Sequence, residues 1–215
     1  MFAVIFEVQP RKERRDDYLA IARELRPALE GIDGFIDNER FASRRREGWL
    51  LSLSTWRDEK ALIRWRTLGR HHQAQVRGRQ DVFRDYHLRV GEVTADTAAG
   101  AGLTSQRLDE TETGAAKAVT ISEWTPGEGE TMAALGLAER QAPGLVEHEL
   151  FESIYDQGRL LLLAAWRDAA AAQSWRPQDT RATQLRHRQV RIIRDYGMFD
   201  RREAPQFYPP VERGG

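Results

Sequence analysis

The sequence predicts an α+β fold in which two ferredoxin-like β-α-β-β-α-β units pack on each other within one chain. Three observations lead to this prediction. Residues 31–66 recur as residues 142–176 at a constant offset of 110. Strand-like and helix-like segments follow the same order in both copies, and a segment without periodicity separates them. Because a unit of this size leaves one face of its sheet uncovered, we expect the two copies to cover each other as an intramolecular pseudo-dimer.

Identical residues that match without a gap identify the repeat. Trp56-Arg57-Asp58 recurs as Trp166-Arg167-Asp168, and Trp65-Arg66 recurs as Trp175-Arg176. Further matches in the same register are Gly34 with Gly144, Glu39 with Glu149, Phe41 with Phe151 and Gly48 with Gly158. Two tryptophans and a triplet in one register indicate that the whole unit was duplicated.

Residue type and spacing justify the elements of the first copy, which we place at residues 1–93. The first strand is rich in β-branched and aromatic residues, and the first helix has apolar residues at helical spacing. Asp58 is a typical N-cap for the second helix. That helix is expected to carry Leu62, Trp65, Leu68 and His72 along one side. The expected strands lie at residues 2–8, 35–42, 49–56 and 86–93, and the first helix lies within residues 11–32.

The second copy is placed at residues 117–210, after a linker at residues 94–116. Its expected elements are a strand at 118–124, a helix near 130–141, a hairpin at 145–166 and a last strand at 190–199. The last strand can be aligned with the first copy in two ways. An offset of 110 pairs Tyr86 with Tyr196, whereas an offset of 100 pairs Val90 with Val190. We prefer the second, which aligns whole strands and implies that the second copy lacks roughly three helical turns after Trp175.

Composition and charge exclude several classes of protein. The 33 basic and 33 acidic side chains balance, which argues against a nucleic-acid-binding protein. The absence of Cys excludes disulfides, thiolate metal sites and a Cys nucleophile, and the five His show no metal-site spacing. No apolar run reaches the ~18 residues of a membrane span, and no secretory signal is visible, so we expect a cytoplasmic protein.

Arginine is used far more often than lysine, which occurs only at Lys12, Lys60 and Lys117. One interpretation is a bias in the nucleotide composition of the genome. The other is selection of Arg for binding anions through two parallel hydrogen bonds. Composition is compatible with both.

Six segments, spread over nearly the whole chain, carry a resemblance to a known family. They read AVIFEV, GFIDNERF, LSLSTWRDEKALIRW, HHQAQVRGR, YHLRVGEV and RDYGMFDRREAP. In these segments the sequence resembles the antibiotic biosynthesis monooxygenase (ABM) domains of the dimeric α/β-barrel superfamily. The resemblance implies that this chain forms by itself the barrel that two protomers usually form. It also implies an oxygenase with a small-molecule substrate and leaves open whether the fused chain forms a further homodimer.

The resemblance further implies a site on the second helix of the first copy. Some ABM enzymes oxidise polyketide phenols to quinones without metal or flavin, and they place a Trp of this helix in the pocket. Trp65 matches that residue, whereas the Asn that those enzymes carry about one turn earlier falls on Ala61. We expect the catalytic residues to be Trp65, His71 and His72, and the substrate-binding residues to be Gln75, Arg79 and Tyr196. In this hypothesis a His deprotonates a phenol, an Arg binds the anion and the Trp stacks on it.

Two alternative functions stay open at this point. Heme-degrading members combine an Asn on the first strand with this Trp and a His ten residues later, where this chain has Gln75. A heme held differently, through His71 or His72, is therefore one alternative to a site without a cofactor. The other is a non-catalytic module that binds a small molecule. Trp65 itself has a structural alternative as a core residue, and the segment from Arg194 to Met198 has one as a tie between the two copies.

Overall fold

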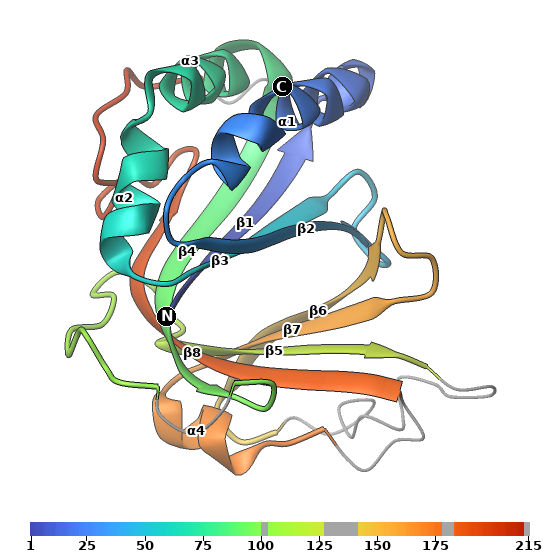
Figure 1. The fold of residues 1–215 in the computed structure, drawn as a ribbon, viewed down its shortest axis with the longest axis vertical. Helices are drawn as coiled ribbons and strands as arrows, with labels where there is room; N and C mark the ends of the chain where they lie inside the picture. Colours follow the sequence, from blue (N-terminus) through green and yellow to red (C-terminus); the bar gives the residue numbers. More distant parts are fainter. Residues whose placement is uncertain (100–102, 127–141, 178–182, 213–215) are drawn as a thin grey trace.

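The computed structural model describes residues 1–99, 103–126, 142–177 and 183–212, and its elements occur in two similar series (Figure 1). The first series comprises β1 (Phe2–Pro10), a short 3-10 helix (Lys12–Arg14), α1 (Arg15–Glu30), β2 (Phe35–Ser43), β3 (Leu50–Trp56), α2 (Glu59–Thr67), α3 (Gly69–Arg77), one π-helical turn (Gly78–Val82) and β4 (Phe83–Asp96). The second comprises β5 (Ala118–Thr125), β6 (Leu145–Ser153), β7 (Leu160–Trp166), α4 (Ala169–Ser174) and β8 (Thr183–Gly197).

The eight strands of the described residues form one closed antiparallel barrel in the order β1-β3-β2-β6-β7-β5-β8-β4. Each copy contributes four neighbouring strands, β4-β1-β3-β2 and β6-β7-β5-β8, which is the strand order of a ferredoxin-like sheet. The two sheets join where β2 pairs with β6 and where β4 pairs with β8. Helices α1, α2 and α3 lie outside the first sheet and α4 lies outside the second (Figure 1). The predicted fold and the intramolecular pseudo-dimer are therefore confirmed.

The register of the last strands decides between the two alignments of the copies. Ile5 of β1 lies opposite Arg89 of β4, and Ile121 of β5 lies opposite Arg188 of β8. Arg188 is thus the counterpart of Arg89, at an offset of 99 (188 − 89). This register excludes the offset of 110 and lies one residue from the preferred offset of 100. The difference of one residue matters, because it moves every side chain of a strand to the other face of the sheet.

Side chains fill the interior of the barrel. Its apolar part includes Ala3, Ile5, Phe41, Leu51, Leu53, Ile121, Phe151, Leu161, Leu163, Val190 and Ile192. Each copy adds one buried ion pair, between Glu7 and Arg89 and between Glu123 and Arg188. Burial raises the pKa of Glu7, but the guanidinium groups of Arg89 and Arg46 outweigh burial and bring this pKa below its ordinary value. The carboxylate is therefore ionised at neutral pH.

Two further arginines connect these pairs across the copies. Arg46, in the turn after β2, bonds Glu7 of its own copy and lies 2.9 Å from Glu149 of the second copy. Arg159, after the matching turn of the second copy, lies 2.6 Å from Glu123 and 2.9 Å from Glu39 of the first copy. The two halves are therefore joined by buried charge as well as by backbone hydrogen bonds.

The helical segment after β3 differs from the single helix that we expected. Asp58 caps α2 as predicted, because its carboxylate accepts a hydrogen bond from the Ala61 amide at 2.8 Å. The helix then stops at Leu68, whose backbone is extended (φ −61°, ψ 127°), and α3 begins at Gly69. The break turns α3 so that His71 faces back toward Trp65. The helix expected near residues 130–141 lies outside the described residues.

The last strand of each copy is longer than expected. β4 starts at Phe83 and continues to Asp96, and β8 starts at Thr183, because its first residues pair with β5. The predicted linker packs along the barrel, where the amides of Gln106 and Arg107 donate hydrogen bonds to the Glu92 carboxylate. In the part of the chain that the structure describes, no helix is long and apolar enough to cross a membrane.

Candidate active site

A cavity of about 210 Å³ lies in the first copy, between the outer face of the sheet and helices α1, α2 and α3. Residues at the end of β8 and after it close the remaining side. Aliphatic and aromatic side chains form most of the wall, namely Val4, Phe6, Ile21, Leu25, Leu29, Leu62, Phe83, Leu88 and Val90. The sheet supplies this apolar face because successive side chains alternate, so Val4 and Phe6 point out of the barrel while Ile5 points in.

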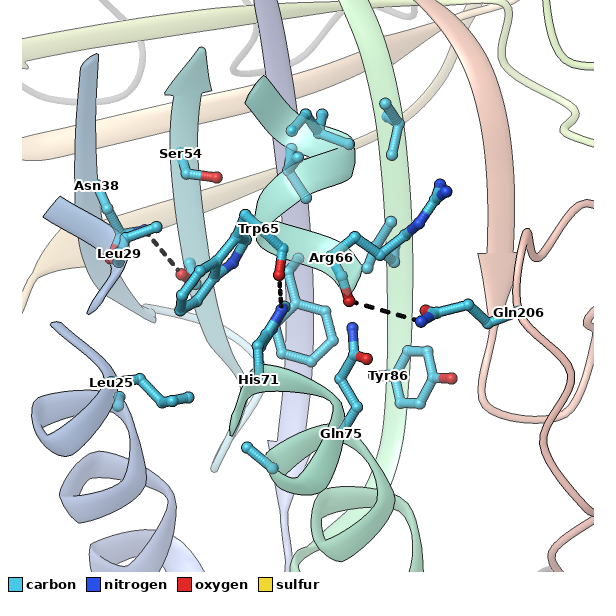
Figure 2. A pocket seen from close by; sticks show the side chains of 18 of the residues that line it. Leu25, Leu29, Asn38, Ser54, Trp65, Arg66, His71, Gln75, Tyr86 and Gln206 are labelled. Atoms are coloured by element: carbon cyan, nitrogen blue, oxygen red, sulfur yellow. Dashed lines mark hydrogen bonds between the residues drawn. The ribbon is translucent and has the colours of Figure 1, made fainter. Parts of the chain in front are cut away.

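Trp65 and His71 form a stacked pair in the wall of this cavity (Figure 2). Their ring centroids lie 4.1 Å apart with an angle of 16° between the planes, and His71 Nδ1 lies 3.0 Å from the Trp65 carbonyl oxygen. A carbonyl oxygen only accepts hydrogen bonds, so Nδ1 carries the imidazole proton and Nε2 is left as an acceptor. Burial lowers the pKa of His71 to about 4, and the ring is therefore neutral at pH 7.

The second predicted histidine, His72, does not line the cavity. Its side chain is exposed, and its Nδ1 lies 3.2 Å from the hydroxyl of Tyr208 in the C-terminal segment. Tyr208 donates its proton to Gln75 Oε1 at 2.9 Å, and both Tyr208 and Gln75 line the cavity. The two adjacent histidines therefore have different surroundings: His71 lies at the cavity and His72 holds the C-terminal segment from outside.

Arg79 is built into the protein by its own hydrogen bonds. The side chain is buried, and it donates to the Tyr86 hydroxyl at 2.8 Å and to the carbonyl oxygens of Met198 at 3.1 Å and Pro209 at 3.3 Å. Arg201 donates to the same Tyr86 hydroxyl at 2.5 Å. These contacts fasten the C-terminal segment beside the cavity. Arg79 also lines the cavity, and its role in binding a substrate anion stays a prediction.

Tyr196 reaches the cavity from β8, the last strand of the second copy. Burial raises its pKa to about 12, so the phenol keeps its proton and can donate a hydrogen bond. The preceding residue has a different orientation, since Asp195 lies 2.6 Å from Nε2 of His87 on β4. The segment from Arg194 to Met198 therefore lines the cavity and also ties β8 to β4, and substrate binding by Tyr196 stays a prediction.

The cavity wall carries an excess of positive charge. The arginines that line it are Arg40, Arg66, Arg79, Arg194 and Arg201. Glu59 is the one acidic residue of this wall, and both of its carboxylate oxygens lie 2.8 Å from Arg107. Within the described ranges, none of the five arginines forms an ion pair with a carboxylate. Arg40, Arg66 and Tyr208 of this wall were not predicted from the sequence, in which the only signal for the arginines is the excess of Arg over Lys.

The equivalent position of the second copy belongs to the core. Trp175, the counterpart of Trp65, is buried, with its ring centroid 5.7 Å from that of Trp166 and 5.6 Å from that of His187. His187 in turn lies 2.9 Å from the Ser122 hydroxyl. The duplicated tryptophan thus lines a cavity in one copy and packs tightly in the other.

Comparisons with known proteins show to which family the chain belongs. Residues 1–77 and 129–182 match the model of the antibiotic biosynthesis monooxygenase family. A relative from Pyricularia oryzae, named jasmonate monooxygenase ABM, is 44% identical over 221 residues, which cover 98% of this chain and all of the relative.

Solved structures with a similar fold share little sequence with this chain. An aldoxime dehydratase in complex with butyraldoxime is 12% identical with a TM-score of 0.51, over 89% of this chain and 79% of its own. An anthrone oxidase-like protein is 11% identical with a TM-score of 0.39, over 95% of this chain and 96% of its own. Because the family model spans more than half of the chain and the full-length relative is 44% identical, the chain belongs to the antibiotic biosynthesis monooxygenase family.

Proposed function

We propose that this chain is a monooxygenase that oxidises a small, largely apolar molecule in the cavity of its first copy. The observation that carries the proposal is the stacked Trp65–His71 pair in an apolar cavity of an ABM domain. A wall of this kind excludes water, so positive charge placed in it stabilises a substrate anion more strongly than it would in solution. A phenolate stabilised in this way is electron-rich and reacts with dioxygen without competition from solvent.

Two classes of substrate suit an apolar cavity with positive charge in its wall. The name of the relative suggests jasmonate, a cyclopentanone carboxylic acid. The resemblance to quinone-forming ABM enzymes suggests a phenol of aromatic or polyketide type. Both classes combine an apolar body with one group that is or becomes anionic. We propose jasmonate as the first substrate to test, because the relative is 44% identical over its full length.

The two classes differ in the electrons that they require. A phenol that is oxidised to a quinone supplies both electrons itself: one oxygen atom enters the ring and the other leaves as water with the two hydrogens that the phenol loses. Hydroxylation of a saturated carbon needs two electrons and two protons from an external donor, such as a reduced flavin or nicotinamide. We therefore propose a cofactor-independent reaction for a phenol and an externally supplied reductant for jasmonate.

In the phenol reaction we assign the proton transfer to His71. Its Nε2 carries the free lone pair, and the neutral ring can accept a proton. A pKa of about 4 makes the ring a weak base, so the transfer depends on stabilisation of the resulting phenolate by nearby guanidinium groups. Trp65 offers a flat surface for the substrate ring, and the protonated hydroxyl of Tyr196 offers a hydrogen bond.

Aerobic incubation under ¹⁸O₂ tests the proposal, with jasmonic acid and an anthrone as substrates and mass spectrometry as the readout. Each substrate is offered with and without NADPH and free flavin. We expect a product that carries one ¹⁸O atom, and a rate at least ~10-fold lower for His71→Ala than for the control His148→Ala, which lies outside the cavity. Absence of labelled product from both substrates under all conditions would contradict the proposal and favour a binding module.

A titration with hemin tests the expectation that the site works without a resident heme. We expect no saturable shift of the Soret band, because the stacked Trp65 ring covers one face of His71 and leaves little room for a large planar group beside the free Nε2. A saturable shift that disappears in His71→Ala would support the heme-binding alternative instead.

A further inference from the structure

Four of the five arginines of the cavity fall into two groups according to their hydrogen bonds, and the fifth is Arg40. Arg79 and Arg201 donate to Tyr86 and to backbone carbonyl groups of the C-terminal segment. Arg66 and Arg194, in contrast, donate to no acceptor in the described part of the chain, and Nε of Arg66 is buried without a hydrogen-bond partner. A buried N–H group that lacks an acceptor costs free energy, which a bound acceptor recovers. Arg66 and Arg194 are therefore available for a ligand.

Arg66 and Arg194 approach the same end of the cavity from different elements. Figure 2 shows the Arg66 side chain extending from α2 toward β4 and β8, with its guanidinium group directed away from Trp65. Arg194 lies on β8 opposite Val90 of β4, which also lines the cavity. The guanidinium groups of Arg201, Arg66 and Arg194 all act on Tyr196, where they partly offset the effect of burial on its pKa. Arg66 of α2 and Arg194 of β8 therefore line the cavity within electrostatic reach of one phenol.

No carboxylate of the described wall forms an ion pair with these two cations. Glu59 is engaged by both hydrogen bonds from Arg107. Asp195 is the acidic neighbour of Arg194 in sequence, but it lies on the other face of β8 and contacts His87. Arg194 acts on Asp109, which does not line the cavity and whose pKa is lowered mainly by its hydrogen bonds with Arg107. Both cations therefore lie in the wall of a largely apolar cavity.

We propose that Arg66 and Arg194 form a carboxylate-binding subsite, which anchors one end of an apolar monocarboxylic acid in the cavity. The planar guanidinium group matches the two oxygens of a carboxylate through parallel hydrogen bonds. The apolar wall of β1, β4 and α1 holds the hydrocarbon body. This inference rests on the proposed function, because it names the class of the substrate that the same cavity oxidises.

Arg40 does not belong to this subsite. It lies on β2, which is separated from β4 by β3 and β1 in the sheet. Its Nε is buried without a hydrogen-bond partner, as that of Arg66 is, but its Nη1 donates to the hydroxyl of Tyr155 of the second copy at 3.5 Å. Arg40→Gln therefore serves as a test of where the anion binds. A second comparison is Arg70→Gln, since Arg70 is exposed on α3 and does not line the cavity.

Isothermal titration of the full chain with jasmonic acid and with its methyl ester tests the subsite directly. The two probes share the apolar body and differ in the anionic group. We expect wild type to bind the acid about 10- to 100-fold more tightly than the ester, as for a charge-assisted hydrogen-bonded pair. Arg66→Gln and Arg194→Gln should each remove most of this preference and leave the affinity for the ester within about 2-fold. Arg70→Gln should retain the wild-type preference.

Three results would overturn the subsite. The first is that wild type binds acid and ester equally, or binds neither. The second is that Arg66→Gln weakens the binding of both probes by the same factor, which indicates a purely structural role. The third is that Arg40→Gln alone removes the preference for the acid.

The binding data also distinguish this inference from the proposed function. Selective binding of the acid without turnover contradicts the monooxygenase and leaves the subsite intact. Equal turnover of acid and ester contradicts the subsite and leaves the monooxygenase intact.

Discussion

Trp65 and Trp175 occupy equivalent positions in the two copies but have different neighbours. Trp65 is half-buried and stacks on His71 at the cavity, whereas Trp175 is 8% exposed and packs on Trp166 and His187. A buried aromatic ring contributes to stability through the area that it removes from water and through close contacts. The two residues should therefore contribute differently to folding and to activity.

Replacing each tryptophan by alanine should separate the two contributions. We expect Trp175→Ala to lower the free energy of unfolding by about 3–5 kcal/mol, as for a large core residue, and Trp65→Ala to lower it by less than half as much. Turnover should show the opposite order, with the larger loss in Trp65→Ala. Urea denaturation and rate measurements on both variants check this. Equal loss of stability in the two variants would make Trp65 a core residue.

Two neutral imidazoles make the stability depend on pH. Burial lowers the pKa of His71 and of His187 to about 4 in the folded chain, whereas an unfolded His has a pKa near ~6.5. Below pH 6.5 the unfolded chain therefore binds protons that the folded chain does not. Stability falls over this range, by roughly 2 kcal/mol at pH 5 for buried His187. Carboxylates with lowered pKa values lose their contribution only at lower pH.

The variant His187→Asn tests this dependence while keeping a polar side chain near Ser122. Between pH 7.5 and pH 5 we expect the free energy of unfolding to fall for both proteins. The fall should be smaller for the variant than for wild type, and the difference between the two should be roughly 2 kcal/mol. Urea denaturation at the two pH values measures both slopes. Identical slopes would show that His187 is not the group that takes up the proton.

At the scale of elements, the C-terminal segment completes the cavity of the other copy. Gln206 and Tyr208 lie in the wall, and the carbonyl oxygen of Pro209 accepts from Arg79. Glu203 anchors the segment by accepting hydrogen bonds from the Thr111 hydroxyl and the Asp195 amide, both at 2.7 Å. The anchor therefore lies before the residues that line the cavity.

Truncation after Ala204 should open the cavity and leave the barrel folded. The change removes Gln206 and Tyr208 from the wall but retains Glu203 and all of the described strands. We expect KM for the substrate to rise at least ~10-fold, because an opened wall admits water and loses apolar contact. The midpoint of urea unfolding should change little. Unchanged KM in the truncated chain would show that the segment does not form part of the site.

Local patterns were sufficient to predict most of the elements but not how they meet. The strands and the Asp58 cap depend on residues close in sequence, and both were predicted. The break at Leu68 was not predicted, because Gly69 in an otherwise helical pattern does not specify a stop. The helix break places the His71 ring against the Trp65 ring. One continuous helix would have placed His72 on the same side as Trp65, which is why the sequence predicted His72 at the cavity, whereas it contacts Tyr208 from outside. Contacts of Tyr208 with α3 span more than 130 residues and leave no local signal.

At the scale of the whole molecule, buried charge joins the copies inside the barrel. The repeat predicted the two-copy architecture, since each sheet needs a partner for its open face. It did not predict the pairing of Glu7 with Arg89, or the contact of Arg46 with Glu149. These pairs depend on strand register, where a shift of one residue exchanges the two faces.

Removal of one buried carboxylate should destabilise the whole barrel. Glu7→Ala removes the buried partner of Arg89 and leaves it only the exposed Glu147, whose carboxylate lies 3.2 Å away, which should lower the free energy of unfolding by about 3–5 kcal/mol. Asp33→Ala is a matched control, because Asp33 pairs with Arg57 at the surface, and it should change stability far less. Urea denaturation of both variants checks the difference. A small effect of Glu7→Ala would show that Glu147 replaces Glu7 as the partner of Arg89.

If oxidation takes place in the cavity of the first copy, a side chain that fills this cavity should stop the reaction. Ala74 lies in the wall on α3, so Ala74→Trp should occupy the space, whereas Ala20→Trp adds the same side chain to the exposed face of α1. The measurement is the rate of ¹⁸O incorporation into substrate by the two variants. We predict a rate at least ~10-fold lower for Ala74→Trp and a wild-type rate for Ala20→Trp. A wild-type rate for a folded Ala74→Trp protein would contradict the account.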